Sequence, residues 1–524
     1  MEYSGVCLIA AEEPRTVEQA LSELCWRNAM LTEMQSIEAN RTWEICDLPR
    51  NQKAIGLKWV FKVKKDPEGN IVKHKARLVA KGYAQRQGVD FDEVFAPVAR
   101  IETVRVLLAL AAQGGWEVHH MDVKSAFLNG DLTETVFVQQ PPGFIIGKGD
   151  KVLKLRKALY GLRQAPRAWN AKLDKEMMAL GFERSKLEHA VYRRSSKNSF
   201  LIVGVYVDDL IILGPSVSDI KQFKAEMKRK FSMSDLGLLS YYLGIEVKQG
   251  AGGITLSQGA YAVKILEGAG MMNCNSCETP MEPRLKLCKY KEGEAVDLTA
   301  YRSIIGSLRY LVNTRPDLAF SVGVVSRHME APGKQQWSAV KHILRYLKGT
   351  INYGCKYERG TELKPMLLGY SDSDFAGDVE DRKSTTGVVY FLGNSLVTWA
   401  SQKQKIVALS SCEAKYVAAA VAACQGVWLS RLIADMMGTK ETPVKLLMDN
   451  MSAIALSRNP VHHDRSKHID TKYHFIRECI EAGKVEVEHV GTAGQLADIF
   501  TKSLGRIKFV EQRSALGVVP VQQV

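Results

Sequence analysis

The sequence predicts an α+β protein with several structural units, and three observations support that prediction. The chain has 524 residues, more than one hydrophobic core usually organises, so about three to five units are expected. Apolar residues make up 46% of the chain and charged residues 24%, which is typical of a folded protein. Strand and helix patterns mix up to residues 359–362, beyond which their order indicates a separate α/β unit.

The N-terminal region is predicted to begin with a helix followed by strands. Residues 16–40 place apolar side chains at helical spacing, and Thr16 can cap the first turn. Strands are expected at 43–49 and at 57–64. The second of these alternates apolar and basic side chains, which predicts one buried face and one cationic face.

A basic hairpin is the next predicted feature. A turn at 66–69 joins the strand at 57–64 to a strand at 71–80. Such a hairpin could lie over a nucleic-acid backbone or clamp a triphosphate. A solvated edge that discourages aggregation is the alternative, and the pattern leaves both open. The basic side chains of this segment include Lys62, Lys64, Lys73, Lys75, Arg77 and Lys81.

Helices and strands alternate through the middle of the chain. An amphipathic to buried helix is predicted at 100–113 and ends at Gly114 and Gly115. Residues 159–169 lead into another helix, with Pro166 near its first turn. Further on, the expected elements are a charged helix at 220–231, a strand at 241–247 and a mostly helical region at 254–357.

The segment at 200–214 contains two adjacent carboxylates, Asp208 and Asp209, within an apolar stretch. Carboxylates are expensive to desolvate, so a fold keeps such a pair where a turn exposes it or a cation compensates it. With Asp122 from a neighbouring strand, the pair can hold two divalent metals for phosphoryl chemistry. An ordinary hairpin turn, which Asp favours on its own account, is the alternative.

A second set of acids lies in the C-terminal unit. Asp372 and Asp449 each end a predicted strand, Glu413 lies at a helix start, and Asp498 follows an apolar run. Four acids from four elements, converging at one sheet edge, would hold two Mg²⁺ ions. Each also has a structural alternative: Ser410 and Glu413 match a capping box, and the aspartates could be caps or surface acids.

Charge and cysteine content restrict the class of protein. The net charge of +14 and the pI near 9.1 favour an anionic partner, for which nucleic acid fits best, and a solvated basic surface is the alternative. The ten cysteines follow no disulfide spacing, so reduced, intracellular thiols are expected. Cys274 and Cys277 form a lone CxxC, which does not predict zinc. No secretory signal is found, and no apolar run reaches membrane-spanning length.

Eight motifs between residues 13 and 502 together resemble one family, in its order. They are Lys-Trp-Val-Phe-Lys at 58–62, Lys-Ala-Arg-Leu-Val-Ala-Lys-Gly-Tyr-Ala-Gln at 75–85, Met-Asp-Val-Lys-Ser-Ala-Phe-Leu-Asn-Gly at 121–130, Leu-Tyr-Gly-Leu-Arg-Gln-Ala-Pro-Arg-Ala-Trp at 159–169, Tyr-Val-Asp-Asp at 206–209, Leu-Gly-Ile-Glu at 243–246, Arg-Pro-Asp at 315–317 and Lys-His-Ile-Asp-Thr-Lys-Tyr-His-Phe at 467–475. The chain resembles the reverse transcriptase–ribonuclease H part of copia-type LTR retrotransposon polyproteins.

The resemblance implies a right-hand polymerase of fingers, palm and thumb, followed by a connection and an RNase H-like α/β domain. The expected units are fingers and palm at 13–235, thumb at 236–282, connection at 283–365, RNase H-like domain at 366–505 and a weakly structured tail at 506–524.

The resemblance also implies roles for single residues of the polymerase. Asp122, Asp208 and Asp209 would be the catalytic carboxylates that bind two Mg²⁺, and carboxylate oxygens accept Mn²⁺ as well. Phe127 would exclude a ribose 2′-hydroxyl from the nucleotide site. The other nucleotide contacts would be Lys75, Arg77, Lys81 and Gln164, and the template–primer contacts would be Arg163, Tyr206, Tyr242 and Gly244.

In the C-terminal domain, Asp372, Glu413, Asp449 and Asp498 would be the catalytic and metal-binding acids that cut RNA in an RNA–DNA hybrid. One departure matters. Several ribonuclease H enzymes carry a mobile histidine shortly before the last aspartate, but residues 491–497 contain none. The metal ions would then act without that histidine, with slower product release.

The function implied is RNA-directed and DNA-directed DNA synthesis with ribonuclease H activity. The partners implied are an RNA template, a DNA or tRNA primer, RNA–DNA hybrids, dNTPs and other polyprotein products such as capsid and integrase, with no membrane. A cytoplasmic virus-like particle or the nucleus is the expected location. No zinc knuckle, aspartic-protease motif or integrase array is found, so a processed product, a truncated genomic copy or an expressed fragment is expected.

Two alternatives to that function stay open. The chain could be an inactive or domesticated relic that binds nucleic acid without catalysis, although all seven candidate acids are present. It could also keep only the ribonuclease activity.

Overall fold

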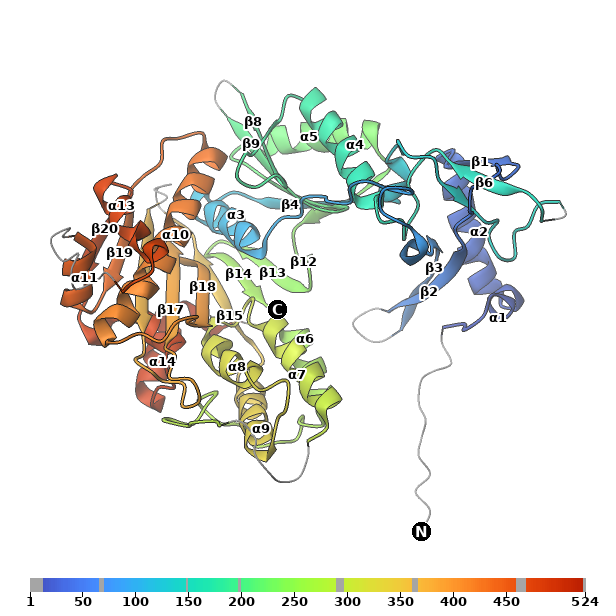
Figure 1. Cartoon of the computed structure of the whole chain (residues 1–524). Coiled ribbons are helices and arrows are strands. Elements are labelled where there is room, and N and C mark those ends of the chain that lie inside the picture. The colour runs from blue at the N-terminus through green and yellow to red at the C-terminus, as the bar shows by residue number, and fades with distance from the viewer. Residues whose placement is uncertain are drawn as a thin grey trace, which may run out of the picture.

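The computed structural model describes residues 13–65, 70–147, 149–196, 199–288, 296–360, 366–458 and 468–521. The predicted turn at 66–69 and the first residue of the 467–475 motif lie outside this part of the chain. Within it the chain forms five β-sheets. Figure 1 shows the units along an arc, with the N-terminal elements at one end, the C-terminal sheet at the other and the helical middle of the chain below.

Two helices and two small sheets form the N-terminal unit. Thr16 caps the first helix as predicted, because its Oγ1 accepts a hydrogen bond from Gln19 N at 3.2 Å. The prediction of one helix at 16–40 is wrong, because extended backbone at Glu23 divides the segment into two. The elements are α1 (Val17–Ser22), α2 (Leu24–Ala39), β1 (Trp43–Cys46), β2 (Leu57–Lys65), β3 (Ile71–Ala80), β5 (Phe137–Val138) and β6 (Val152–Leu155).

The predicted basic hairpin is formed by β2 and β3, which pair antiparallel with Lys62 opposite Lys75. Ala76 and Leu78 of β3 are buried in the core of this unit, while the alternate residues Lys75 and Arg77 are half-buried on the other face. In β2, for which the sequence predicted alternation, Leu57 and Phe61 are buried while Lys62 is exposed, so that prediction is confirmed.

A six-stranded sheet with strand order β11-β4-β10-β9-β8-β7 forms the central unit. Leu210 and Ile212 pack in a core with two helices on one face, whereas Ile211 and Leu213 belong to the core on the other face. The strands are β4 (Val118–Val123), β7 (Glu183–Arg184), β8 (Val191–Ser195), β9 (Phe200–Tyr206), β10 (Asp209–Leu213) and β11 (Met233–Leu238), and the helices are α3 (Ile101–Gly114), α4 (Ala165–Ala179) and α5 (Val217–Lys230).

The middle unit has a sheet with strand order β12-β13-β14-β15-β21. The strand predicted at 241–247 is instead a tight hairpin, because Leu243 and Gly244 have φ of 49° and 72°. Positive φ at both central residues is the pattern of a type I′ turn. The elements are β12 (Tyr241–Tyr242), β13 (Ile245–Gly250), β14 (Gly253–Ser257), β15 (Tyr353–Glu358), β21 (Val518–Pro520), α6 (Gly259–Gly268), α7 (Leu298–Leu311), α8 (Ala319–Ser326) and α9 (Lys334–Gly349).

The Arg-Pro-Asp motif at 315–317 holds this unit together by a buried ion pair. Arg315 Nη2 lies 2.8 Å from Asp317 Oδ2, and both side chains are at most 1% exposed. Tyr346 Oη donates to the same carboxylate at 2.7 Å, and the Arg315 guanidinium donates to Thr350 O at 2.7 Å. Burial opposes ionisation of Asp317, but Arg315 outweighs it and holds the pKa of that carboxyl below its ordinary value.

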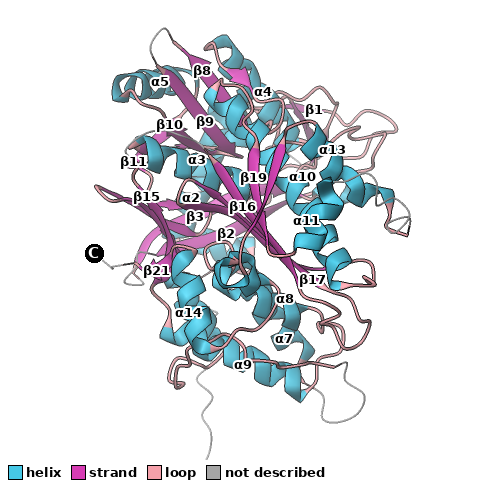
Figure 2. Cartoon of the chain, turned by 90° about the vertical axis from the view of Figure 1, so that its left-hand side faces the viewer, coloured by secondary structure: helices cyan, strands magenta, loops and turns pink. Residues whose placement is uncertain are grey.

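The C-terminal unit has a sheet with strand order β18-β17-β16-β19-β20, in which β16, β19 and β20 are parallel and the other pairs antiparallel. Figure 2 shows α10 and α11 alongside this sheet. The elements are β16 (Leu367–Ser373), β17 (Thr385–Leu392), β18 (Ser395–Lys403), β19 (Val444–Met448), β20 (Val485–His489), α10 (Ser411–Met437), α11 (Met451–Arg458), α13 (Phe475–Glu481), η7 (Leu496–Phe500) and α14 (Arg506–Ala515).

The expectation of a weakly structured tail at 506–524 is wrong for the described residues. Phe509 and Leu516 are buried, which fixes α14 against the unit, and Val518 of β21 pairs with Cys355 of β15. The chain therefore returns to the middle unit after completing the C-terminal one. The predicted unit boundaries stay predictions, although this sheet joins strands from three of the predicted segments.

Helix α10 also differs from expectation, because its 27 residues include a stretch with mean hydropathy of 1.5, long and apolar enough to cross a membrane. Of that stretch, 72% is buried inside the protein. Burial against the sheet explains its composition, since core helices are apolar on most sides.

We expect Asp317→Ala to lower the free energy of unfolding by about 3–5 kcal/mol, because Arg315 then stays buried without a counter-charge. Urea unfolding followed by circular dichroism measures the loss. The double replacement Arg315→Met with Asp317→Leu removes both charges and should lose far less. Equal losses in the single and double variants would contradict a role for charge pairing.

Candidate functional site

The turn between β9 and β10 carries the paired carboxylates. Tyr206 pairs with Asp209, so Val207 and Asp208 form a two-residue turn. Val207 has φ of 58°, and positive φ at the first central residue alone is the pattern of a type II′ turn. A β-branched side chain is strained in this region, so the surroundings must hold the turn in place.

Two hydrogen bonds hold this turn. Trp169 of α4, which is buried, donates its indole Nε1–H to Val207 O at 2.6 Å. Val123 N of β4 donates to Asp208 O at 2.9 Å. The strained turn is thus attached to a helix on one side and to a strand on the other, which fixes the backbone that carries Asp208.

The hairpin carboxylates, Asp122, Asp208 and Asp209, lie at one end of the central sheet. Asp122 of β4 is directly opposite Asp209 of β10. Burial raises the pKa of Asp122 and of Asp208, and the neighbouring carboxylates of the set raise both further. His120 Nε2 lies 2.8 Å from Asp209 Oδ1. Negative charge is therefore concentrated here, with one histidine as the direct partner among the described residues.

The basic hairpin reaches these carboxylates. Burial, then Arg77 and Lys64, lower the pKa of Lys75, while Asp122 acts in the opposite direction. The Arg77 guanidinium lies 4.9 Å from the centre of the Tyr160 ring. Lys75 and Arg77 are therefore within electrostatic reach of Asp122 and Asp208, and their contact with a nucleotide stays a prediction.

Tyr160 and Phe127 form an aromatic pair beside the site, with ring centres 4.8 Å apart. Burial raises the pKa of Tyr160 to about 12, and Asp208 and Asp122 contribute to that rise. Phe127 follows the end of β4, five residues beyond Asp122, where the sequence predicted it. Tyr160 lies in the motif at 159–169, whose aromatic side chains suit base stacking by sequence, and that role stays a prediction.

Three other residues that were predicted to contact nucleotide or template form hydrogen bonds within the protein. Gln164 is 1% exposed, accepts from Gln85 Nε2 at 2.9 Å and donates to Asp90 O at 3.0 Å. Arg163 Nε donates to Gly82 O at 3.1 Å. The third residue, Lys81, is half-buried at the end of β3, and its N donates to Gly56 O at 2.9 Å. A direct nucleotide or template contact by these residues stays a prediction.

Tyr206 ends β9, next to the turn. Tyr242 is buried, with its ring centre 5.8 Å from that of His120. Gly244 lies in the type I′ turn, and a Cβ there would meet Tyr310 Oη at 2.5 Å. The structure therefore brings Tyr242 to the carboxylates through His120 and leaves Gly244 at the tip of the neighbouring hairpin.

The C-terminal carboxylates, Asp372, Asp449 and Asp498, lie at one edge of the C-terminal sheet. The parallel register that pairs Tyr370 with Leu447 brings Asp372 and Asp449 to the same end of adjacent strands. Lys415 Nζ of α10 donates to Asp372 Oδ1 at 2.6 Å and to Asp449 Oδ1 at 2.5 Å. Burial opposes ionisation of Asp372, but Lys415 outweighs it and holds the pKa below its ordinary value.

Asp498 is joined to the same edge by a different set of contacts. Thr501 Oγ1 donates to Asp372 Oδ2 at 2.9 Å and Lys508 Nζ donates to Asp498 Oδ2 at 2.5 Å. Lys502 Nζ lies 2.7 Å from Asp498 Oδ1, although that oxygen receives no well-aligned hydrogen bond in the described structure. Burial raises the pKa of Asp498 despite these lysines.

Glu413 lies apart from the three aspartates in its contacts. Ser410 Oγ accepts from Glu413 N at 3.1 Å, so Ser410 caps the helix, but this is only one half of the capping box weighed in the sequence. The Glu413 carboxylate itself accepts from Leu409 N at 2.9 Å and lies 3.1 Å from His468 Nε2. Helix capping is therefore not the only interaction of Glu413, because its carboxylate also contacts His468.

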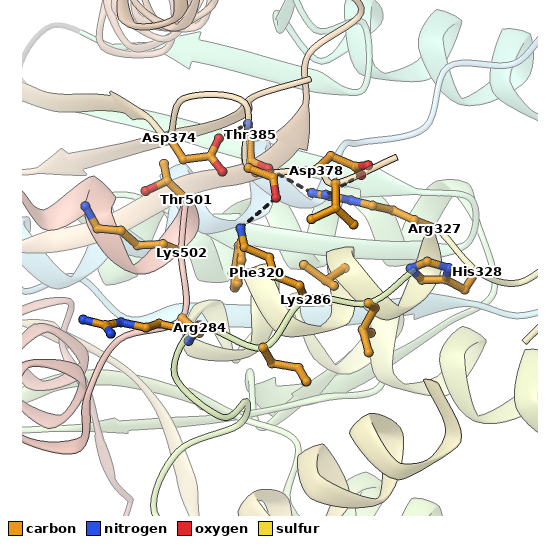
Figure 3. Close-up of a pocket in the computed structure, with 16 residues that line it drawn as sticks. Arg284, Lys286, Phe320, Arg327, His328, Asp374, Asp378, Thr385, Thr501 and Lys502 are labelled. Carbon is orange, nitrogen blue, oxygen red and sulfur yellow. Dashed lines mark hydrogen bonds and ion pairs between the residues drawn. The ribbon is translucent and has the colours of Figure 1, made fainter. Parts of the chain in front are cut away.

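A cavity of about 330 Å³ lies beside Thr501 and Lys502, which contact the C-terminal carboxylates (Figure 3). Thr501 and Lys502 line it, together with basic side chains from the middle unit. Lys286 Nζ donates to Gly377 O at 2.8 Å, and Arg327 lies 3.3 Å from Asp378. The cavity therefore has a basic flank from two units, and Asp374 and Asp378 line it as well.

The donor chemistry of both carboxylate sets fits divalent metal ions. Carboxylate oxygens are the ligands that Mg²⁺ prefers, and the pKa values of Asp122 and Asp208 are raised by burial and by neighbouring negative charge, both of which a bound cation would offset. The buried Oδ1 of Asp498 is an acceptor of the same kind that receives no well-aligned hydrogen bond in the described structure, although Lys502 Nζ lies 2.7 Å from it. Among the described residues, no three Asp, Glu, His or Cys side chains are gathered closely enough to hold an ion. Two-metal coordination stays a prediction.

Several residues that shape these sites were not assigned in the sequence. The position of His120 could have been predicted, because it lies two residues before Asp122 and residues two apart on a strand share a face. No signal in the sequence indicated the contacts of Trp169 and Lys415, because their partners are distant in sequence and become neighbours only through the fold.

Comparison with known proteins finds relatives along the whole chain. The reverse transcriptase (RNA-dependent DNA polymerase) family matches residues 40–283. The Retrovirus-related Pol polyprotein from transposon RE1 of Arabidopsis thaliana is 40% identical over 523 residues, which are 99% of this chain and 36% of that protein. That from transposon TNT 1-94 of Nicotiana tabacum is 40% identical over 520 residues, 97% of this chain and 39% of that protein. A Saccharomyces cerevisiae protein named for transposon Ty5-1 is 35% identical over 303 residues, 57% of this chain and 98% of the yeast protein.

The family match contains all three hairpin carboxylates, and the plant relatives extend over the C-terminal ones as well. The chain spans 36% to 39% of the length of these plant relatives. It belongs to the copia-type family of retrotransposon Pol polyproteins and carries their reverse transcriptase region.

Proposed function

We propose that this chain is an RNA-directed and DNA-directed DNA polymerase with ribonuclease H activity in its C-terminal unit. One observation carries the polymerase proposal. The strand register sets Asp122 opposite Asp209, with Asp208 in the adjoining turn, inside the region that matches reverse transcriptases. Three carboxylates at one sheet end are the ligand set that phosphoryl transfer with two metal ions requires.

In this proposal the units take the parts of a right hand. The N-terminal helices and basic hairpin are the fingers, the six-stranded sheet is the palm, and the helical middle unit supplies thumb and connection. Figure 1 supports the assignment, because the hairpin β2–β3 and helices α6 to α7 lie on the two sides of an arc whose centre is the palm sheet.

The chain's own residues bind and orient the reactants. Lys75 and Arg77 would meet the triphosphate, since they lie on the half-buried face of β3 within electrostatic reach of the carboxylates. Phe127, packed on Tyr160, would lie against the sugar of the incoming nucleotide. Mg²⁺ held by Asp122, Asp208 and Asp209 would lower the pKa of the primer 3′-hydroxyl and stabilise pyrophosphate.

The ribonuclease proposal is supported by the C-terminal sheet. Asp372 and Asp449 end adjacent parallel strands, and Asp498 is linked to that edge through Thr501. Glu413, beside His468, is the fourth acid of the set. The basic flank of the neighbouring cavity would accept the phosphate backbone of a hybrid. The template, primer, polyprotein partners and intracellular location expected from the sequence are part of the same proposal.

Primer extension on an RNA template with Mg²⁺ and dNTPs tests the polymerase directly. We expect Asp208→Asn to reduce extension by at least about 100-fold while sparing cleavage of an RNA–DNA hybrid, because metal ligands act locally. Asp449→Asn should have the opposite pattern.

These paired variants also separate the alternatives. Loss of both activities from one substitution would show that the two-site assignment is wrong. Hybrid binding without extension or cleavage in the unmodified chain would favour the relic, and cleavage without extension would favour the ribonuclease alone.

The raised pKa of Asp208 predicts a dependence of stability on pH. Because the folded pKa lies above the ordinary value, the ionised group destabilises the folded protein once the pH exceeds that pKa. Asp208→Asn should therefore raise the metal-free Tm by about 1–2 °C at pH 8. The gain should vanish as the pH falls below the ordinary value of 3.8, because the carboxyl is then protonated in both the folded and the unfolded protein.

Differential scanning calorimetry measures this effect, with the exposed Asp92→Asn as a matched control. Mg²⁺ should raise the Tm of the unmodified chain more than that of Asp208→Asn. Equal Mg²⁺ responses would argue against metal binding at the hairpin carboxylates.

We expect Phe127→Val to increase incorporation of ribonucleotides relative to deoxyribonucleotides by about 10- to 100-fold, because a smaller side chain leaves room for the 2′-hydroxyl. Single-nucleotide extension with each triphosphate measures the ratio. Phe144→Val, which removes an aromatic ring packed 5.8 Å from that of Trp59, should leave the ratio unchanged. An unchanged ratio in Phe127→Val would remove this residue from the nucleotide site.

A further inference from the structure

The side chain of Lys415 joins two of the C-terminal carboxylates. Its Nζ lies 2.6 Å from Asp372 Oδ1 and 2.5 Å from Asp449 Oδ1. The side chains of Asp372 and Asp449 are 1% and 8% exposed, so this ammonium group is their main counter-charge in a water-poor setting. The Lys415 ammonium group therefore acts as a singly charged cation that bridges two carboxylates.

The remaining groups at this edge are also paired. The second oxygen of Asp372 accepts from Thr501, and Asp498 lies within ion-pair distance of Lys502 and Lys508. Three lysines therefore face three buried or nearly buried aspartates. The C-terminal carboxylates are neutralised by the protein itself.

The hairpin carboxylates are compensated much less. Among the described residues, Asp122 and Asp208 form no ion pair with a lysine or arginine, and Asp209 meets only His120. Burial and, after it, the neighbouring carboxylates raise the pKa of Asp122 and Asp208, whereas the Lys415 ammonium outweighs burial and holds that of Asp372 below its ordinary value. The two carboxylate sets thus differ in how strongly they attract a further cation.

We propose that Lys415 is a positioning residue that sets the divalent-cation requirement of the C-terminal carboxylates. A divalent cation can share Asp372 and Asp449 only after the Lys415 ammonium has moved off them. The flexible four-carbon stem of lysine allows this without movement of α10. The consequence, which rests on the proposed ribonuclease activity, is that cleavage of a hybrid needs a higher Mg²⁺ concentration than DNA synthesis by the same chain.

The first experiment measures binding without any reaction. Free Mn²⁺ is followed by electron paramagnetic resonance in the Asp208→Asn background, which weakens the other site. Adding Lys415→Met removes the competing ammonium at nearly constant volume and should tighten Mn²⁺ binding on the order of tenfold. Lys415→Arg keeps the positive charge and should restore the weaker binding.

A matched control is Lys445→Met on β19, which removes a lysine of the same unit that pairs with Glu488 at 2.7 Å. It should leave Mn²⁺ affinity unchanged. Unchanged or weaker Mn²⁺ binding in Lys415→Met, with circular dichroism like that of the parent chain, overturns the proposal.

The second experiment needs no variant that could fail to fold. In the unmodified chain, Mg²⁺ is titrated in parallel for primer extension and for hybrid cleavage. We expect the half-maximal Mg²⁺ concentration to be several-fold higher for cleavage, and equal or lower values would overturn the proposal. Absence of cleavage at every Mg²⁺ concentration would refute the proposed ribonuclease, while the Mn²⁺ measurements would still decide the role of Lys415.

Discussion

The burial of helix α3 is the constraint on which the arrangement of the units depends. Eleven of its fourteen residues are buried, because the helix lies between the central sheet and strands β14, β15, β17 and β18 of the two later units. Arg105 ties these together: its Nε donates to Val397 O at 2.8 Å, its Nη1 donates to Asn313 O at 3.0 Å, and its guanidinium lies 3.8 Å from the centre of the Trp399 ring. A buried arginine is tolerated only with such partners, so the three units must pack in one orientation. The two carboxylate sets therefore keep a fixed relation through this helix.

The buried carboxylates of this protein fall into three groups, which differ in the charged side chains that surround them. Asp317 is paired permanently with Arg315 and has a structural role. Asp372 is paired with a lysine whose stem is flexible enough to release it. Asp208 is left with like-charged neighbours at a strained turn, which the fold maintains through Trp169.

Features that depend on local chemistry could be predicted from the sequence. Thr16 caps its helix, Gly115 ends α3 with φ of 63°, and the alternation of β2 separates its basic face from its buried face. The carboxylates of the candidate sites were also found, because acids that interrupt apolar strands are conspicuous. Features that depend on distant partners could not be predicted. The pairing of Lys415 with Asp372 and Asp449 arises from a helix and two strands that meet only in the fold, and residues 506–520 find their partners far upstream.

That last pairing has a consequence for synthesis of the chain. Strand β15 of the middle unit has β14 on one side and β21 on the other, and β21 lies beyond the whole C-terminal unit in sequence. On a ribosome the middle unit therefore exposes one unpaired strand edge until the C-terminal unit has emerged. Unpaired edges invite pairing with other chains, and contacts between distant segments form slowly. Nascent chains should be most prone to aggregation during this interval, and a chaperone that covers strand edges would act on them then.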